Sequence, residues 1–399
     1  MAEVFIYMGE GSLVVPNDVV RVRVHPSVTE IPDRAFFNRN NLEEVELCEG
    51  LLGIGNEAFY GCDSLKRLRV PSTVKTIGRA AFEECRSLKE VRLGDGIETI
   101  GLNAFSCSGK ATHLRIPPLV TTVSRGMASN YSKCTFTLEV PEGLRRIEDY
   151  AFSSFGSLRN VAFPADSSIS STSLHICPEL RQVLGVENRD GGSREGLPII
   201  DALKHRFDNL SIHKMIYYQS YNNNTLDRLN DAMNASSTLV QELLDISGNQ
   251  QDCLGMTPLH ILACSTIQNL ELYKVWIEKY PKTLVTEDAW GALPLFYAIW
   301  GQVPEEIIQF LVQKYQSLYP DHEFDWSMMI ETLGRADTPK NTIQSLLGAQ
   351  QQYFPNQIID WNTILENASA APSSSNNYQQ TSLGSFRHLL ELSISKRTQ

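Results

Sequence analysis

Histidine and cysteine are the side chains that most often bind zinc or act as nucleophiles and general bases, and this chain of 399 residues has eight of each. Cys62, Cys85 and Cys177 fall at one phase of a sequence repeat, and no two cysteines form a CxxC pair. A metal site needs several ligands that converge on one point, which a single column of thiols does not supply. We therefore expect small buried thiols and no bound metal.

His205 and His213, in "KHRFDNLSIHK", are eight residues apart, a spacing that can place both on one helix face. No third ligand accompanies them. We interpret them as surface or packing histidines.

Catalytic and nucleotide-binding motifs are absent from the sequence. It has no G-x-S-x-G elbow, no H-E-x-x-H pair, no Walker loop and no kinase signature. The stretch "GDGIETIG" from Gly94 resembles a phosphate-binding loop, but "PSTVKTIG" stands at the same place one repeat earlier, which indicates a turn between units. We expect no catalytic residue, no cofactor, no small-molecule ligand and no enzymatic activity.

Charge and hydropathy limit the partners. The net charge is −11. Residues 1–184 carry 20 basic and 22 acidic residues, a net of −2, whereas residues 185–399 carry 15 and 24, a net of −9. Neither half has the clustered positive charge of a nucleic-acid binder. An apolar run of about 18 residues is also missing, so we expect no membrane span.

The cysteines also bear on localisation. The N-terminus lacks the basic and apolar regions of a signal peptide, and the thiols show no paired spacing. Reduced thiols are typical of a reducing compartment, so we expect a cytoplasmic protein with eight free cysteines.

A repeat of about 23 residues organises the first half of the chain. "IGNEAFYGCDSLKRLRVPSTVKT" from Ile54 is followed by "IGRAAFEECRSLKEVRLGDGIET" from Ile77. The seven units open at Ile31, Ile54, Ile77, Ile100, Val123, Ile147 and Ile169. Such short units can bury their apolar residues only by stacking on one another, so the repeat predicts a solenoid.

Each unit has two recognisable segments. An Ala-Phe pair, as in Ala81-Phe82, predicts a turn or short helix. An alternating segment such as "LKRLRV" predicts a strand with one buried face, and these strands should pair in parallel on the opposite side. We expect Phe59, Phe82 and Phe105 to form one buried column.

The pattern of opening Ile, Ala-Phe and L-x-x-[VL]-x-[VLIF] resembles the BspA-like leucine-rich repeat family over residues about 20–184. The resemblance implies an α/β fold, a leucine-rich repeat solenoid with a parallel sheet. We assign residues 1–184 to this domain. Residues 185–198, "GVENRDGGSREGLP", are rich in Gly and charge and predict a linker.

The second half has a helical period, as in "IIDALKHRF", "IHKMIYYQSY" and "TLDRLNDAM". A second repeat begins at Asp252 and returns at Asp288, Asp325 and Asp360, and its long helices should end at Tyr280-Pro281, Tyr319-Pro320 and Phe354-Pro355. We assign residues 199–366 to an all-α helical repeat domain. For residues 367–399, which are rich in Ser, Asn and Gln, we expect a flexible tail in which "LGSFRHLLELSISKR" is able to form one short helix.

The unit "DCLGMTPLHILACS" from Asp252 resembles an ankyrin repeat. The resemblance implies that Thr257 caps a helix, that Pro258 takes its first position and that His260 ties the turn to the neighbouring unit. The second unit departs from this pattern at Leu293 and Phe296. A generic array of helical hairpins stays open as the alternative.

One surface carries a charge pattern. Residues between the buried positions of successive strands lie side by side about 4.8 Å apart. In one such column Arg69, Arg92 and Arg115 run together. Like charges opposite one another are unfavourable, so these arginines are candidate partner-binding residues for a protein with an acidic segment. A solvated face is the other interpretation.

The sequence therefore predicts a non-enzymatic scaffold or adaptor that binds proteins through two repeat surfaces. The alternative is a cell-surface adhesin or carbohydrate-binding protein, because BspA-like repeats are often exported.

Overall fold

The described residues of the computed structural model fall into two compact units, Met1–Ile267 and Gln268–Gln399. The structure describes residues 4–9, 15–108, 111–130, 137–156, 158–185, 197–221, 224–233, 248–301, 303–327, 347–348, 350–351, 354, 356–357 and 359–361. In this part of the chain, no helix is both long enough and apolar enough to cross a membrane.

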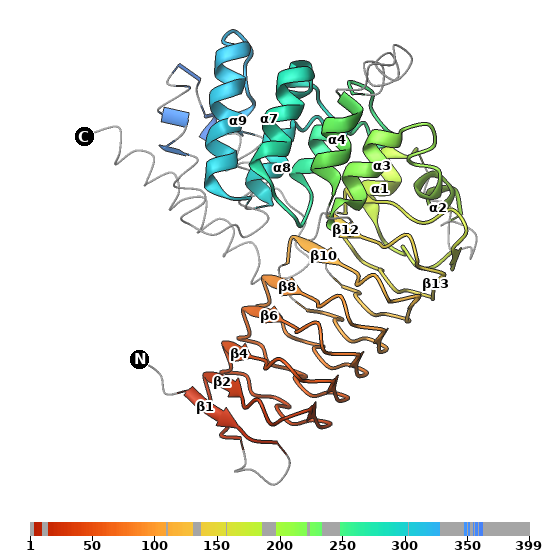
Figure 1. Ribbon diagram of the computed structural model, residues 1–399, viewed down its shortest axis with the longest axis vertical. Coiled ribbons are helices and arrows are strands. Elements are labelled where there is room, and N and C mark those ends of the chain that lie inside the picture. The colour runs from red at the N-terminus through yellow and green to blue at the C-terminus, as the bar shows by residue number, and fades with distance from the viewer. Residues whose placement is uncertain are drawn as a thin grey trace. The chain divides into compact units, whose positions relative to one another are not determined.

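Parallel strands form one side of a β-solenoid in the first unit, here called the first ladder. Its strands are β1 (Val4–Tyr7), β2 (Arg21–Val24), β4 (Glu44–Glu46), β6 (Arg67–Arg69), β8 (Glu90–Arg92), β10 (His113–Arg115), β12 (Thr137–Glu139) and β14 (Asn160–Val161). They bond in the order β1-β2-β4-β6-β8 and again as β10-β12-β14. Figure 1 shows them stacked as successive rungs. The predicted parallel pairing is confirmed.

The opening residues of the units form a second ladder of two-residue strands. Its strands are β3 (Glu30–Ile31), β5 (Gly53–Ile54), β7 (Thr76–Ile77), β9 (Thr99–Ile100), β11 (Thr122–Val123), β13 (Arg146–Ile147) and β15 (Ser168–Ile169). Ile54 lies opposite Ile77, and Ile77 opposite Ile100. Each coil therefore has two short strands, and the Ala-Phe segment forms the turn between them.

The turns contain residues with positive φ at the third and seventh positions after the opening residue, as at Glu57 (54°) and Gly61 (68°). Most side chains disfavour this conformation. The backbone N–H of Glu57 donates to the carbonyl of Arg79 at 2.8 Å, and that of Gly61 donates to the carbonyl of Glu83 at 2.9 Å. The next coil thus stabilises the turn of the coil before it.

Phenylalanine rings fill the space behind the turns. Phe36, Phe59, Phe82 and Phe105 are fully buried, and their ring centroids are 4.7, 5.1 and 5.3 Å apart in nearly parallel planes. The predicted column of Phe59, Phe82 and Phe105 is confirmed.

The cysteine column has a structural role. Cys62 and Cys85 donate from Sγ to the carbonyls of Phe36 and Phe59, each at 3.3 Å. Cys177 does the same to Phe152 at 3.7 Å. Burial raises the pKa of the Cys62 thiol to about 12. The seven cysteines among the described residues form no disulfide bond, and no group of three or more His, Cys, Asp or Glu there could hold a metal ion.

Helices follow the solenoid in the first unit. Those among the described residues are α1 (Pro178–Val183), α2 (Leu197–Lys204), α3 (Ser211–Tyr217), the 3-10 turn η1 (Tyr218–Tyr221), α4 (Thr225–Met233) and α6 (Pro258–Ala263). α3 packs against α6. Nearly all of the predicted linker, residues 186–196, lies outside the described residues, so the division into domains stays a prediction.

The second unit contains α7 (Leu270–Lys279), the 3-10 helix η2 (Pro281–Val285), α8 (Pro294–Trp300) and α9 (Glu305–Leu318). α8 and α9 pack on each other, and both contact η2. α7 ends just before Tyr280-Pro281 and α9 just before Tyr319-Pro320, which confirms two of the three predicted helix ends. The repeat units from Asp325 and Asp360 and the tail 367–399 lie almost wholly outside the described residues.

The units that begin at Asp252 and Asp288 each open with a turn of the same hydrogen-bond pattern. In each, Oδ1 of the aspartate accepts two backbone N–H groups, from Leu254 and Met256 in the first and from Trp290 and Ala292 in the second. A glycine with positive φ completes each turn, and a helix then begins at a proline. The repeat of about 36 residues is thus visible in the backbone.

Thr257 precedes α6 as its N-cap, and Pro258 is the first helical residue, as predicted. The backbone N–H of Thr257 donates to Nδ1 of His260 at 3.1 Å. This contact of His260 therefore closes its own helix start. The tie of His260 to the neighbouring unit stays a prediction.

Candidate interaction surface

Charged side chains fill the outward positions of β2, β4, β6 and β8, five arginines and three glutamates in all. Ion pairs join neighbouring strands: Arg21 to Glu44 at 3.4 Å, and Arg23 to Glu46. Their side chains are about half exposed. Solvent and salt screen exposed pairs of this kind, so they add little to stability. This face is an exposed ladder of charged side chains with more arginines than glutamates.

Arg69 and Arg92 lie directly opposite each other on β6 and β8. Both side chains are 67% exposed, and both contact one carboxylate oxygen of Glu90, at 3.4 Å from Arg69 and 2.7 Å from Arg92. One carboxylate thus serves two guanidinium groups. Each keeps N–H donors that face solvent, and one positive charge is not neutralised.

Arg115 lies on the next strand along but does not share this exposure, so the expectation that all three arginines project from one exposed face is wrong for Arg115. The hydrogen-bonded order ends at β8 and resumes at β10. The Arg115 side chain is only 15% exposed. It donates to the Ser220 carbonyl at 2.9 Å and lies over the Tyr221 ring at 4.3 Å. The turn η1 therefore covers the third arginine.

Residues 206–221 and 248–266 of the first unit, here called the cover, lie over the outward face of β10, β12 and β14. Thr137, Glu139 and Asn160, whose counterparts in β2–β8 are exposed or half-buried, are buried here. The Tyr217 hydroxyl donates to the Leu138 carbonyl at 2.7 Å and accepts from the Ala162 N–H at 3.0 Å. Its oxygen thus lies between β12 and β14.

Two further contacts fasten this cover. The Tyr221 hydroxyl donates to the Ile116 carbonyl at 2.7 Å. The Glu139 carboxylate accepts from the backbone N–H of Thr266 at 2.6 Å and from its hydroxyl at 2.8 Å. Burial raises the pKa of Glu139, while the bonds from Thr266 and the charge of Arg115 act in the opposite direction.

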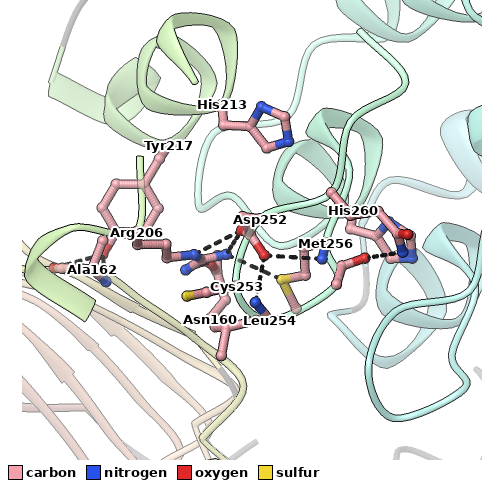
Figure 2. A network of polar contacts seen from close by, with 12 residues as sticks. Asn160, Ala162, Arg206, His213, Tyr217, Asp252, Cys253, Leu254, Met256 and His260 are labelled. Carbon is pink, nitrogen blue, oxygen red and sulfur yellow. Dashed lines mark hydrogen bonds and ion pairs between the residues drawn. The ribbon is translucent and has the colours of Figure 1, made fainter. Parts of the chain in front are cut away.

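A buried ion pair holds the cover at β14, as Figure 2 shows. Both Arg206 and Asp252 have fully buried side chains, and Nη2 of Arg206 lies 2.7 Å from Oδ2 of Asp252. Arg206 also donates to Oδ1 of Asn160 at 2.7 Å and to the Val161 carbonyl at 2.9 Å. Every charged atom of the pair thus has a partner, which is the condition for burying charge at tolerable cost.

His205 and His213 lie in different elements, His205 just after α2 and His213 in α3. His205 is exposed and contacts Asp208 at 2.9 Å. His213 is fully buried, with Nε2 at 3.1 Å from the Gln250 carbonyl. Burial lowers the pKa of His213 to about 4. One is thus a surface histidine and the other a packing histidine, the roles that the sequence indicates.

Sequence reasoning missed Arg206, Tyr217, Tyr221 and the burial of Glu139. The sequence indicated these residues only in part. Asp252 opens a repeat unit, and Tyr217 and Tyr221 are four residues apart in "MIYYQSY", a spacing that can place both on one helix face.

A family model for the BspA type leucine rich repeat region matches residues 18–135 and residues 52–181. Among solved structures, a leucine rich cell surface protein from Faecalibacterium prausnitzii is 29% identical, with a TM-score of 0.35, over 44% of this chain and 46% of that one. A leucine-rich repeat protein of T. pallidum is 23% identical, with a TM-score of 0.34, over 38% of this chain and 73% of that one.

A leucine-rich repeat protein from Bacteroides ovatus is 22% identical, with a TM-score of 0.32, over 42% of this chain and 53% of that one. The chain thus spans less than half the length of the first of these structures. No curated protein matches the chain. The N-terminal part of the chain, within residues 18–181, is thus similar to the BspA type leucine rich repeat region.

Proposed function

We propose that the protein is a non-enzymatic scaffold or adaptor that binds a protein partner through the exposed half of the first ladder. The observation that carries the proposal is the pair Arg69 and Arg92, which share one glutamate while both side chains are 67% exposed. The partner contributes an extended acidic segment. Its carboxylates supply the counter-charge that Glu90 alone provides at present.

Geometry favours a peptide over a compact ligand. Neighbouring strands are about 4.8 Å apart, and outward residues of one strand are about 6.6 Å apart, so the arginines present a flat grid of forked donors. Carboxylates bind such forks in pairs. Because the grid is exposed, added salt should weaken the contact.

The helical repeats are proposed as an ankyrin-like second binding region. Support comes from the shared turns at Asp252 and Asp288 and from the capped helix start at Thr257 and Pro258. We also propose a cytoplasmic location. The buried, hydrogen-bonded thiols of Cys62 and Cys85 fit a chain that keeps its cysteines reduced.

The test uses the full chain and defined probes. A fluorescent peptide of alternating Glu and Gly, its Gln counterpart and a glycan array are offered to the wild type and to the double variant Arg69→Glu with Arg92→Glu. Arg146→Glu is the matched control, since Arg146 is also 67% exposed but lies in the second ladder.

We expect the acidic peptide to bind, the double variant to weaken it at least about tenfold, and the control to leave it unchanged. The affinity should fall as salt rises. Equal binding by the double variant would refute the site. Binding of glycans without binding of the acidic peptide would favour the alternative, a carbohydrate-binding adhesin.

A further inference from the structure

The exposed half of the first ladder differs in charge from one end to the other. β2 and β4 carry two outward arginines and two outward glutamates, and ion pairs join Arg21 to Glu44 and Arg23 to Glu46. β6 and β8 carry three outward arginines and one outward glutamate. The surplus of arginines over glutamates on this face therefore lies on β6 and β8.

The outward side of β1 is apolar, in contrast to the charged outward sides of β2, β4, β6 and β8. Figure 1 shows β1 at the N-terminal end of the ladder. Ile6 and Met8 are 44% and 51% exposed, while Tyr7 between them is buried. Val4, on the same side as Ile6, is half-buried. Adjacent apolar side chains that remain in water are typical of a contact site.

Ile6 belongs to the same outward column as Arg69 and Arg92. It lies opposite Arg23, Arg23 lies opposite Glu46, and Arg69 lies opposite Arg92 on the strands that follow. Neighbouring strands are about 4.8 Å apart, so Ile6 is about 14 Å from Arg69 and about 19 Å from Arg92.

These distances match the geometry of an extended peptide that crosses the strands. Such a peptide advances about 3.3 Å per residue, so the two distances equal about four and about six residues. Side chains alternate along an extended chain, so residues i, i+4 and i+6 all point to the same side. One segment can therefore place an apolar side chain on Ile6 and two carboxylates on Arg69 and Arg92.

The open face is bounded beyond β8. On the next strand, β10, the guanidinium of Arg115 donates to the Ser220 carbonyl and lies over the Tyr221 ring. A segment that runs from Ile6 past Arg92 thus meets the cover. The face between β1 and the cover accommodates about seven extended residues.

We infer that the acidic partner segment carries one large apolar residue, four residues from its first carboxylate and six from its second, and that Ile6 and Met8 bind this apolar side chain. The inference rests on the proposed function and adds the spacing that selects the partner. The carboxylates supply an attraction that salt screens. The apolar contact supplies selectivity among acidic segments, because it is lost when the apolar residue is absent or points to the other side.

The test compares three fluorescent peptides on the full chain by anisotropy. Gly-Leu-Gly-Ser-Gly-Glu-Gly-Glu-Gly has the inferred spacing. In the second peptide Ser replaces Leu. The third, Gly-Gly-Leu-Ser-Gly-Glu-Gly-Glu-Gly, has the same composition as the first, but its Leu points to the side opposite the carboxylates. Because the spacing is the same for both chain directions, each peptide is also made in reverse order.

We expect the wild type to bind the first peptide at least about fivefold more tightly than the other two. Ile6→Ser should remove this advantage and leave the affinity for the Ser peptide unchanged. Leu52→Ser is the matched control, because Leu52 is 48% exposed but directly precedes β5 in the second ladder. If thermal unfolding shows that Ile6→Ser does not fold, Met8→Ser carries the same test.

Equal affinities of the wild type for the three peptides would overturn the inference and leave the acidic site intact. An equal loss of affinity for the Leu and Ser peptides in the folded variant would also overturn it. If light scattering showed a dimer that Ile6→Ser dissociates, a second copy of the chain would occupy β1, and the inference would be wrong. Failure of the proposed function would show separately, as unchanged binding of all three peptides by Arg69→Glu with Arg92→Glu.

Discussion

The two halves of the first ladder have the same backbone arrangement but differ in the exposure of their outward side chains. On β2–β8 the outward residues are Arg and Glu, which are exposed or half-buried and pair across strands. On β10–β14 they are residues such as Thr137, Glu139 and Asn160, which are buried under the chain's own helical segment. The inward residues of each coil specify the solenoid. The outward residues determine whether another segment of the chain can pack on the sheet.

The largest effect should come from breaking the ion pair of the covered half. Arg206→Ala leaves Asp252 charged and buried, so we expect a loss of about 3–5 kcal/mol in the unfolding free energy of the first unit. Urea unfolding by circular dichroism measures it. Tryptophan fluorescence separates the units, because all five tryptophans lie in residues 268–399. A loss below about 1 kcal/mol would mean that the cover is held by other contacts.

Phe82→Ala should lower stability by about 3–4 kcal/mol, because the ring lies between two stacked neighbours and leaves a cavity. Thermal unfolding checks the change. Leu52→Ala is the control, since Leu52 is 48% exposed and has little packing to lose. Equal melting of Phe82→Ala and wild type would contradict the idea that inward residues set the common scaffold.

Tyr221→Phe tests one hydrogen bond between the cover and the solenoid. It removes the hydroxyl that donates to the Ile116 carbonyl, and we expect a loss of about 1 kcal/mol in urea unfolding. Tyr60→Phe, on a half-buried ring outside the cover, should change stability little. A neutral result for Tyr221→Phe would leave ring packing as its whole contribution.

The smallest effect is expected in the exposed half. Arg23→Ala breaks the ion pair between Arg23 and Glu46, whose side chains are 55% and 50% exposed, and should leave the unfolding free energy almost unchanged. Any cost should shrink further as salt is added. A loss as large as that of Arg206→Ala would erase the energetic distinction between the two halves.

The solenoid was predictable because its signal repeats. Six intervals of 22 to 24 residues placed Ile54, Ile77 and Ile100 in one register, and the Ala-Phe pairs placed the ring column. The second ladder was not predicted. Its strands have two residues each, too few for an alternating pattern to be visible.

The candidate surface was predictable only where exposure depends on neighbouring repeat units. Arg69 and Arg92 are exposed neighbours, as the phase of the repeat implies. The burial of Arg115 depends on Ser220 and Tyr221, which are more than 100 residues away. No period in the sequence connects such positions, so tertiary contacts alone decide which arginines face solvent.

The contacts of the cover also differ from those of the coils in the order in which synthesis can form them. A coil finds its partner about 23 residues later, as Phe59 does in Ala81. The partner of Arg206, Asp252, is synthesised 46 residues later, and the partner of Glu139, Thr266, 127 residues later. Contacts at such long separation form slowly, while coils can add one by one. A growing chain therefore presents β10–β14 without the complete cover until residue 266 has emerged from the ribosome.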